Sequence, residues 1–226
     1  MNFTFGIITD GNQVDRVNRV VDSISNEATS NDEIFTVCDK NLKYRAALSI
    51  PYDPQKKSWI TRKKNLIAQH ATNDTLVLLH DYLKLEPGWR ASWEQYGVDW
   101  DIGMNVILNL NGERFRDWCA WDDPRHGNEG LCFEPWCSQG IVFKGKACVV
   151  PYSYNQTQYM YISGTYFLVK RQVLLDNPFN ENLCWGAAED VEWSMRVRNK
   201  YKYVMNSNAV VTLMKEKDRI LPYVLI

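Results

Sequence analysis

The stretch SWITRKKNLIAQHATNDTLVLLHDY, residues Ser58 to Tyr82, joins a helical pattern to an apolar strand pattern. Apolar side chains recur at spacings of three and four residues, which predicts a helix from Trp59 to His70 with Ser58 as its cap. The run Leu76 to Leu79 is typical of a buried strand, and it ends at His80-Asp81-Tyr82. A helix that leads directly into a buried strand is the repeating unit of a parallel α/β sheet.

The residues before this stretch continue the same alternation. Short β-rich runs at Phe3 to Thr9, Glu33 to Cys38 and Ala46 to Ile50 predict three more strands. Valine and isoleucine residues from Val14 to Ile24 are spaced by three and four, which predicts a helix between the first two strands. We therefore expect an α/β fold with a mainly parallel sheet and helices on both faces.

The rest of the chain is less regular. Gly112 to Tyr159 is rich in Trp, Gly, Pro, Cys and Asn, which predicts an irregular excursion, with or without a hairpin. Tyr159 to Val169 is predicted to be a strand with Gly164 at its centre, where a ligand or another backbone approaches closely. A helix is expected from about Ala187 and a last strand at Ala209 to Met214. Because no linker or repeat interrupts this order, residues 1–226 are expected to form a single domain.

Composition excludes some classes of function. The chain has 26 Lys and Arg against 27 Asp and Glu, so no basic field predicts nucleic-acid binding. Its 9 Trp, 12 Tyr and 8 Phe serve either as platforms for sugars or as core. The six cysteines show no CxxC spacing, so they are either thiols or include a Cys132–Cys137 bridge. The first residues lack the pattern of a signal peptide or a membrane span, and we expect a soluble, cytoplasmic protein.

Acidic residues follow three of the predicted strands. Ligands bind at the carboxyl ends of parallel strands, so Thr9-Asp10, Asp39 and His80-Asp81 are expected along one edge of the sheet. Asp81 either holds a divalent cation that bridges a diphosphate or caps a turn. Lys64 shares the apolar face of its helix, and its ammonium group either meets a phosphate or extends outward along its alkyl stem.

The segment CWGAAEDVEWSMR places Glu189 and Asp190 in the first turn of a helix. Negative charge there complements the helix dipole, and Glu192 with Arg196 forms an i,i+4 pair. Those effects do not explain Trp185-Gly186, nor two adjacent acids that diverge in direction. One acid would face a pocket as a general base while the other binds a hydroxyl group.

Taken in order, these residues resemble the GT-A type nucleotide-sugar glycosyltransferases, most closely the inverting family 2-like members. The resemblance spans Phe3 to Arg198. In the donor half it matches a polar turn after the first strand, an acid that contacts the nucleotide base, a basic-Asn pair on a helix and a DXD motif at a strand end. The matching residues are, in that order, Thr9-Asp10, Asp39, Lys64-Asn65 and His80-Asp81-Tyr82.

In the other half, the Gly164 strand and Trp185-Gly186 match the acceptor side, and Glu189-Asp190 matches the Gly-x-x-Glu-Asp element. The resemblance implies one GT-A, Rossmann-like domain, with a nucleotide-sugar-binding half at residues 1–110 and an acceptor-binding half at residues 111–226. It implies a glycosyltransferase that moves a sugar from a UDP- or GDP-linked donor to a glycan or other hydroxyl-bearing acceptor. Asp190 would be the general base, and Glu189 would hold an acceptor hydroxyl.

The same resemblance assigns the diphosphate to Lys64 and to Mn²⁺ or Mg²⁺ held by Asp81. The motif reads His80-Asp81-Tyr82, however, and no histidine follows His126 to act as a second ligand. Asp81 therefore binds either the cation or the ribose. Two other functions remain open: a non-catalytic nucleotide-sugar or carbohydrate-binding module of the same fold, and a sugar-nucleotide pyrophosphorylase. The latter would need a Gly-rich phosphate loop where the sequence has ITDGNQVDRV.

Overall fold

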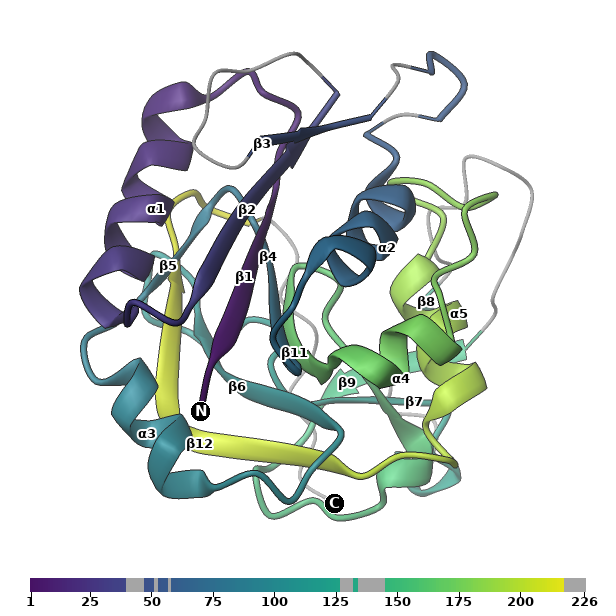
Figure 1. Cartoon of the computed structure of the whole chain (residues 1–226). Helices are drawn as coiled ribbons and strands as arrows, with labels where there is room; N and C mark the ends of the chain where they lie inside the picture. The colour runs from purple at the N-terminus through teal and green to yellow at the C-terminus, as the bar shows by residue number, and fades with distance from the viewer. Residues whose placement is uncertain (40–46, 51–52, 57, 127–131, 134–144, 218–226) are drawn as a thin grey trace.

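A computed structural model describes residues 1–39, 47–50, 53–56, 58–126, 132–133 and 145–217 (Figure 1). Its main element is an eight-stranded sheet in the order β3-β2-β1-β4-β11-β6-β12-β5. The strands are β1 (Phe3–Ile8), β2 (Glu33–Cys38), β3 (Ala47–Ser49), β4 (Thr75–His80), β5 (Leu83–Leu85), β6 (Ile102–Leu108), β11 (Tyr166–Lys170) and β12 (Tyr203–Leu213).

The first half of the sheet is parallel and the second half is mixed. β1 pairs in parallel with β2 on one side and with β4 on the other, and β2 pairs in parallel with β3. β11 is antiparallel to both β4 and β6, β12 is parallel to β6, and β5 is antiparallel to β12. The carboxyl ends of β1, β2 and β4 therefore meet at one edge, as the strand and helix patterns predict.

Helices cover both faces of this sheet. They are α1 (Val14–Glu27), α2 (Ile60–His70), α3 (Trp89–Tyr96), α4 (Arg171–Asp176) and α5 (Glu189–Val197), with short 3-10 turns at Pro124–His126 and Thr157–Tyr159. Figure 1 shows α1 and α2 on opposite sides of β1 and β2. Helix α2 can approach β1 closely because residue 6 is a glycine. A Cβ on Gly6 would lie 2.5 Å from the Ile67 side chain. The α/β fold class expected from the sequence is confirmed.

Two sequence predictions about local structure are wrong. Ser58 makes no capping bond to α2, because Ser58 and Trp59 have φ values of 59° and 26°, whereas a capping residue has an extended backbone. The run from Tyr159 to Val169 is two strands, β10 (Met160–Tyr161) and β11, in different sheets. Both halves of the run are buried and apolar, so its hydrophobicity conceals the turn at Gly164.

Three strands of the excursion after β6 join β10 in a second, four-stranded sheet in the order β10-β7-β9-β8. β7 spans Cys119–Trp121, β8 Cys132–Phe133 and β9 Gly145–Val149. The indole of Trp121 packs directly against β9 because residue 145 is a glycine. A Cβ on Gly145 would lie 2.4 Å from that indole. This small sheet packs against α5 through Val191.

Cys38, Cys119, Cys148 and Cys184 are buried thiols outside any disulfide, and Cys137 lies outside the described residues. No helix in the described part of the chain is both long and apolar enough to cross a membrane.

Candidate active site

Two adjoining pockets lie beyond the carboxyl ends of β1 and β4. The larger pocket has a volume of about 540 Å³, and its lining includes Phe115, Trp121, Tyr161, Trp185 and Asp190. The smaller pocket has a volume of about 120 Å³, and its lining includes Thr9, Asp10, Arg16, Lys63 and Asp81. Four side chains line both pockets: Ile60, His80, Tyr82 and Trp185. The two pockets therefore form one continuous site that an elongated ligand would span.

Asp81 follows β4 and is only 5% exposed. Thr9 Oγ1 donates to Asp81 Oδ2 at 2.6 Å, and Arg16 Nη2 donates to Asp81 Oδ1 at 2.9 Å. Arg16 Nε also donates to the Asp81 carbonyl at 3.1 Å. The expected meeting of Thr9 with Asp81 is thus observed, and Arg16 on α1 joins them.

These contacts bear on the divalent cation expected at Asp81. Both of its carboxylate oxygens are bonded, and its charge is compensated by Arg16. Within the described residues, no three His, Cys, Asp or Glu side chains gather closely enough to hold a metal ion. Mg²⁺ at a nucleotide is held by one or two carboxylates together with phosphate oxygens and waters, and the Asp81 carboxylate is already paired with a guanidinium whose charge repels a cation. The side chains around Asp81 therefore do not fit a divalent cation.

His80 precedes Asp81 and lines both pockets. Its Nε2 is buried and has no hydrogen-bond partner among the described residues. Burial, with Lys64 and Lys217 nearby, holds the pKa of the imidazole well below its ordinary value. His80 is therefore neutral at neutral pH, with a buried ring nitrogen that has no partner among the described residues.

Asp39 and Asp10 lie at the same edge of the sheet. Lys63 Nζ bonds the carbonyl of Thr9 at 2.6 Å and Asp39 Oδ1 at 2.8 Å, although its own side chain is fully buried. Asp10 lines the smaller pocket, and its Oδ1 accepts from Asn12 N at 2.9 Å. The predicted gathering of Thr9-Asp10, Asp39 and His80-Asp81 is confirmed, and Lys63 is the cation that ties the first two strands together.

Lys64 points inward, as its helical face predicts, but it meets a carboxylate. Its Nζ lies 3.0 Å from Glu189 Oε1, and the two side chains are 0% and 7% exposed. The ammonium group also lies 4.6 Å from the centre of the Phe179 ring. Burial raises the pKa of Glu189 above its ordinary value, with Lys64 opposing and Asp190 adding to the shift. Lys64 therefore fixes the start of α5 against α2, and it lines neither pocket.

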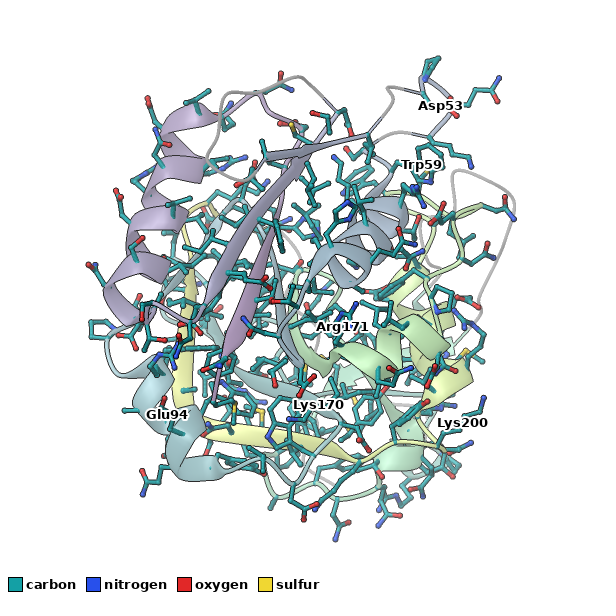
Figure 2. The ribbon with its side chains drawn as sticks, in the orientation of Figure 1. Asp53, Trp59, Glu94, Lys170, Arg171 and Lys200 are labelled. Carbon is teal, nitrogen blue, oxygen red and sulfur yellow. The ribbon has the colours of Figure 1, made fainter. Side chains whose placement is uncertain are left out.

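Asn65 has a similar role in holding the chain. Its Nδ2 donates to the carbonyl of Phe179 at 2.9 Å, and its Oδ1 accepts from Phe179 N at 2.9 Å. Trp59, labelled in Figure 2, lies at the start of α2, and its indole donates to the carbonyl of Glu181 at 2.9 Å. Helix α2 therefore anchors the loop that leads to α5, and Asn65 lines neither pocket.

Asp190 lies at the edge of the larger pocket. Its Oδ2 accepts from Gly164 N at 3.0 Å, which fixes the carboxylate beside the turn between β10 and β11. A Cβ on Gly164 would lie 2.8 Å from Glu189 Oε1 and 3.0 Å from Asp190 Oδ2. The close approach expected at this glycine is observed, and the groups that approach it are the adjacent acids.

The backbone before α5 turns sharply. Gly186 has a φ of 83°, and Ala188, which precedes the first helical residue, has a φ of 52°. A left-handed backbone at a non-glycine residue costs about 1–3 kcal/mol and persists only when surrounding contacts hold it. Here it brings Glu189 and Asp190 to the pocket, with the half-exposed indole of Trp185 (52%) at its mouth.

The aromatic residues of the excursion serve both of the purposes expected from composition, as a pocket wall and as core. Trp121 and Tyr161 line the larger pocket and pack edge to face, 6.0 Å apart. Trp118 is buried in the core and donates to the carbonyl of Tyr154 at 3.1 Å. Trp136 lies outside the described residues.

Sequence reasoning missed five cationic residues that line the pockets: Arg16, Lys63, Arg116, Lys215 and Lys217. Arg16 is the third residue of α1, and it contacts Asp81. Lys215 and Lys217 follow β12 and carry no motif. Lys63 is buried on α2 because its ammonium group contacts Thr9 and Asp39 at the ends of β1 and β2.

Comparisons with known proteins bear on the fold. No protein-family model matches the chain, and no curated protein sequence does. Among solved structures, the chain is similar to S. aureus TarS residues 1–349, with a TM-score of 0.56 and 15% identity over 100% of this chain and 60% of that one.

Two further similar structures are complexes with ligands. S. aureus TarS 1–349 in complex with UDP-GlcNAc has a TM-score of 0.52 and 15% identity over 100% of this chain and 59% of that one. GalNAc-T7 with UDP, GalNAc and Mn²⁺ has a TM-score of 0.62 and 14% identity over 96% of this chain and 44% of that one. The chain spans less than two thirds of each of these structures. Its α/β architecture, with the carboxyl ends of the parallel strands at the site, is the GT-A fold.

Proposed function

We propose that the protein is a glycosyltransferase that moves a sugar from a UDP- or GDP-linked donor to an acceptor hydroxyl, with inversion. The GT-A fold supports this proposal, and so do the ligands of the similar structures, which include UDP and UDP-GlcNAc. In the proposal, residues 1–110 supply most of the donor side of the site and residues 111–226 most of the acceptor side.

One observation carries the proposal: the adjacent acids at the start of α5 have different surroundings. Glu189 is buried and its Oε1 is paired with Lys64, so this carboxylate is held by a contact within the protein although it borders the larger pocket. Asp190 is more exposed, is oriented by Gly164 N, and lines the larger pocket. A general base must reach the proton that it removes. We therefore assign the general base to Asp190, and we assign Glu189 a positioning role rather than the binding of an acceptor hydroxyl.

The proposed reaction is a single displacement. Asp190 takes the proton of the acceptor hydroxyl as that oxygen forms a bond to the anomeric carbon of the donor. The bond from the anomeric carbon to the diphosphate oxygen breaks at the same time, and the diphosphate leaves with the electron pair. Trp185 and Trp121 would receive the sugar faces in the larger pocket, while Thr9, Asp10 and His80 would contact the donor.

The test compares two carboxylate-to-amide variants on the same helical turn. Asp190→Asn should lower nucleotide release from a panel of UDP- and GDP-linked sugars by about 100-fold or more, with donor affinity unchanged within about twofold. Glu192→Gln is the matched control, because Glu192 bonds Arg196 and lines neither pocket. It should retain wild-type release.

Two results would contradict the proposal. Wild-type turnover by Asp190→Asn would remove Asp190 from the chemistry. Tight donor binding without release from any donor or acceptor mixture would make the protein a binding module of the same fold.

A further inference from the structure

Two lysines beyond the last strand lie where the pockets join. β12 pairs with β5 through Leu213 and Leu83, and Met214 N donates to the carbonyl of Tyr82 at 2.7 Å. This register brings the residues after β12 beside the carboxyl end of β4. The Nζ atoms of Lys215 and Lys217 consequently lie 4.2 and 4.3 Å from the centre of the Tyr82 ring.

The positions of these lysines suit a ligand that spans the site. Lys215 lines the smaller pocket, Lys217 lines the larger one, and Tyr82 lines both. A ligand with its anionic centre between two less charged ends would place that centre beside the two ammonium groups. A nucleotide-sugar has this shape, since its diphosphate joins a nucleoside to a sugar.

The positive charge near Tyr82, from Arg16, Arg116, Lys215 and Lys217, exceeds the negative charge of the nearby Asp81 and Asp10. The Arg16 guanidinium lies 6.0 Å from the same ring, and Asp81, which neighbours both lysines, is already bonded to Arg16 and Thr9. Burial, together with repulsion from Lys215 and Arg116, lowers the pKa of Lys217 to about 8. Like charges that are held together in a pocket favour an anion with more than one charge.

We propose that Lys215 and Lys217 bind the diphosphate of the donor and supply the positive charge that a divalent cation would otherwise bring. The inference rests on the proposed function, because it takes the donor to be a nucleotide-sugar. It agrees with the side chains around Asp81, which fit a guanidinium rather than a metal ion. Fixed ammonium groups beside the leaving diphosphate would stabilise the charge that develops there.

The experiment is calorimetric titration with UDP and with GDP, each in EDTA and in Mn²⁺. The proteins are the wild type, Lys215→Ala, Lys217→Ala and a control, Lys202→Ala, whose lysine pairs with the exposed Asp99. One nucleotide should bind the wild type in EDTA, with an affinity that Mn²⁺ changes by less than about twofold. Each site variant should bind about tenfold or more weakly, and the control should match the wild type.

Thermal unfolding of the same proteins without ligand separates binding from folding. The unfolding temperature of Lys217→Ala should equal or exceed that of the wild type, because the substitution removes one of several mutually repelling charges. Binding that requires Mn²⁺, with both site variants equal to the wild type, would overturn the inference and leave the transferase proposal standing. Failure of the folded wild type to bind either nucleotide in both conditions would overturn both.

Discussion

Lys64→Met removes the charge of a buried ion pair and keeps a side chain of similar length. Glu189 would then stay 7% exposed without its partner, and it would either remain ionised or take up a proton. Removing one partner of a buried pair costs about 3–5 kcal/mol. Protonating a carboxyl group whose ordinary pKa is about 4.3 costs about 1.4 kcal/mol per pH unit, or about 4 kcal/mol at pH 7. We expect Lys64→Met to lower the free energy of unfolding by about 3–4 kcal/mol at pH 7.

The cost should depend on pH with a defined sign. The folded state of the variant raises the pKa of Glu189 further above that of the unfolded chain. Stability is therefore lost as pH rises from the unfolded pKa toward the folded one, and it is retained below both. At pH 5 the cost should be about 1 kcal/mol.

Equilibrium urea unfolding, followed by tryptophan fluorescence at pH 5 and pH 7, measures both values. The double variant Lys64→Met, Glu189→Gln carries no buried charge at this point and should recover most of the loss at pH 7. A cost at pH 7 below about 1 kcal/mol, or one that is equal at the two pH values, would refute the buried pair.

Two further predictions concern the acids and their anchor. Gly164→Ala should lower nucleotide release by about tenfold or more with donor affinity unchanged, because its Cβ would displace Glu189 and Asp190. Activity equal to the wild type would show that the acids tolerate the shift. Asn65→Ala should lower the free energy of unfolding by about 1–3 kcal/mol through the lost bonds to Phe179, with nucleotide affinity nearly unchanged. A selective loss of nucleotide affinity in urea-stable Asn65→Ala would instead place Asn65 in the donor site.

Local patterns predict the first half of the chain well because its strands and helices follow one another along the sequence. The runs Phe3 to Thr9 and Glu33 to Cys38 agree with β1 and β2 to within a residue, and Leu76 to Leu79 lies inside β4. Parallel pairing then brings Asp39 and Asp81 to one edge without further information. The acidic residues therefore meet because of the hydrophobic periodicity of the elements and their order along the chain.

The cations of the site depend on contacts between distant residues. Lys215 reaches Tyr82 because β12 pairs with β5, and no local pattern encodes that pairing. Lys63 is buried because its ammonium group reaches Thr9 and Asp39 at the ends of β1 and β2, which are distant in the sequence. The turn at Gly164 is concealed by buried residues on both sides of it. Sequence reasoning therefore found the acids and missed most of the groups that compensate them.

One turn of α2 has a consequence for how the chain is made. Lys63 bonds the ends of the first two strands, Lys64 pairs with Glu189, and Asn65 holds Phe179. During synthesis, Lys64 has no carboxylate to accompany it into the interior until residue 189 has left the ribosome. Burying an ammonium group alone is strongly unfavourable, so α2 should dock late and almost together with α5. The nascent first half of the chain would consequently remain incompletely folded and sensitive to protease. Both sides of the proposed site would become rigid in the same folding step.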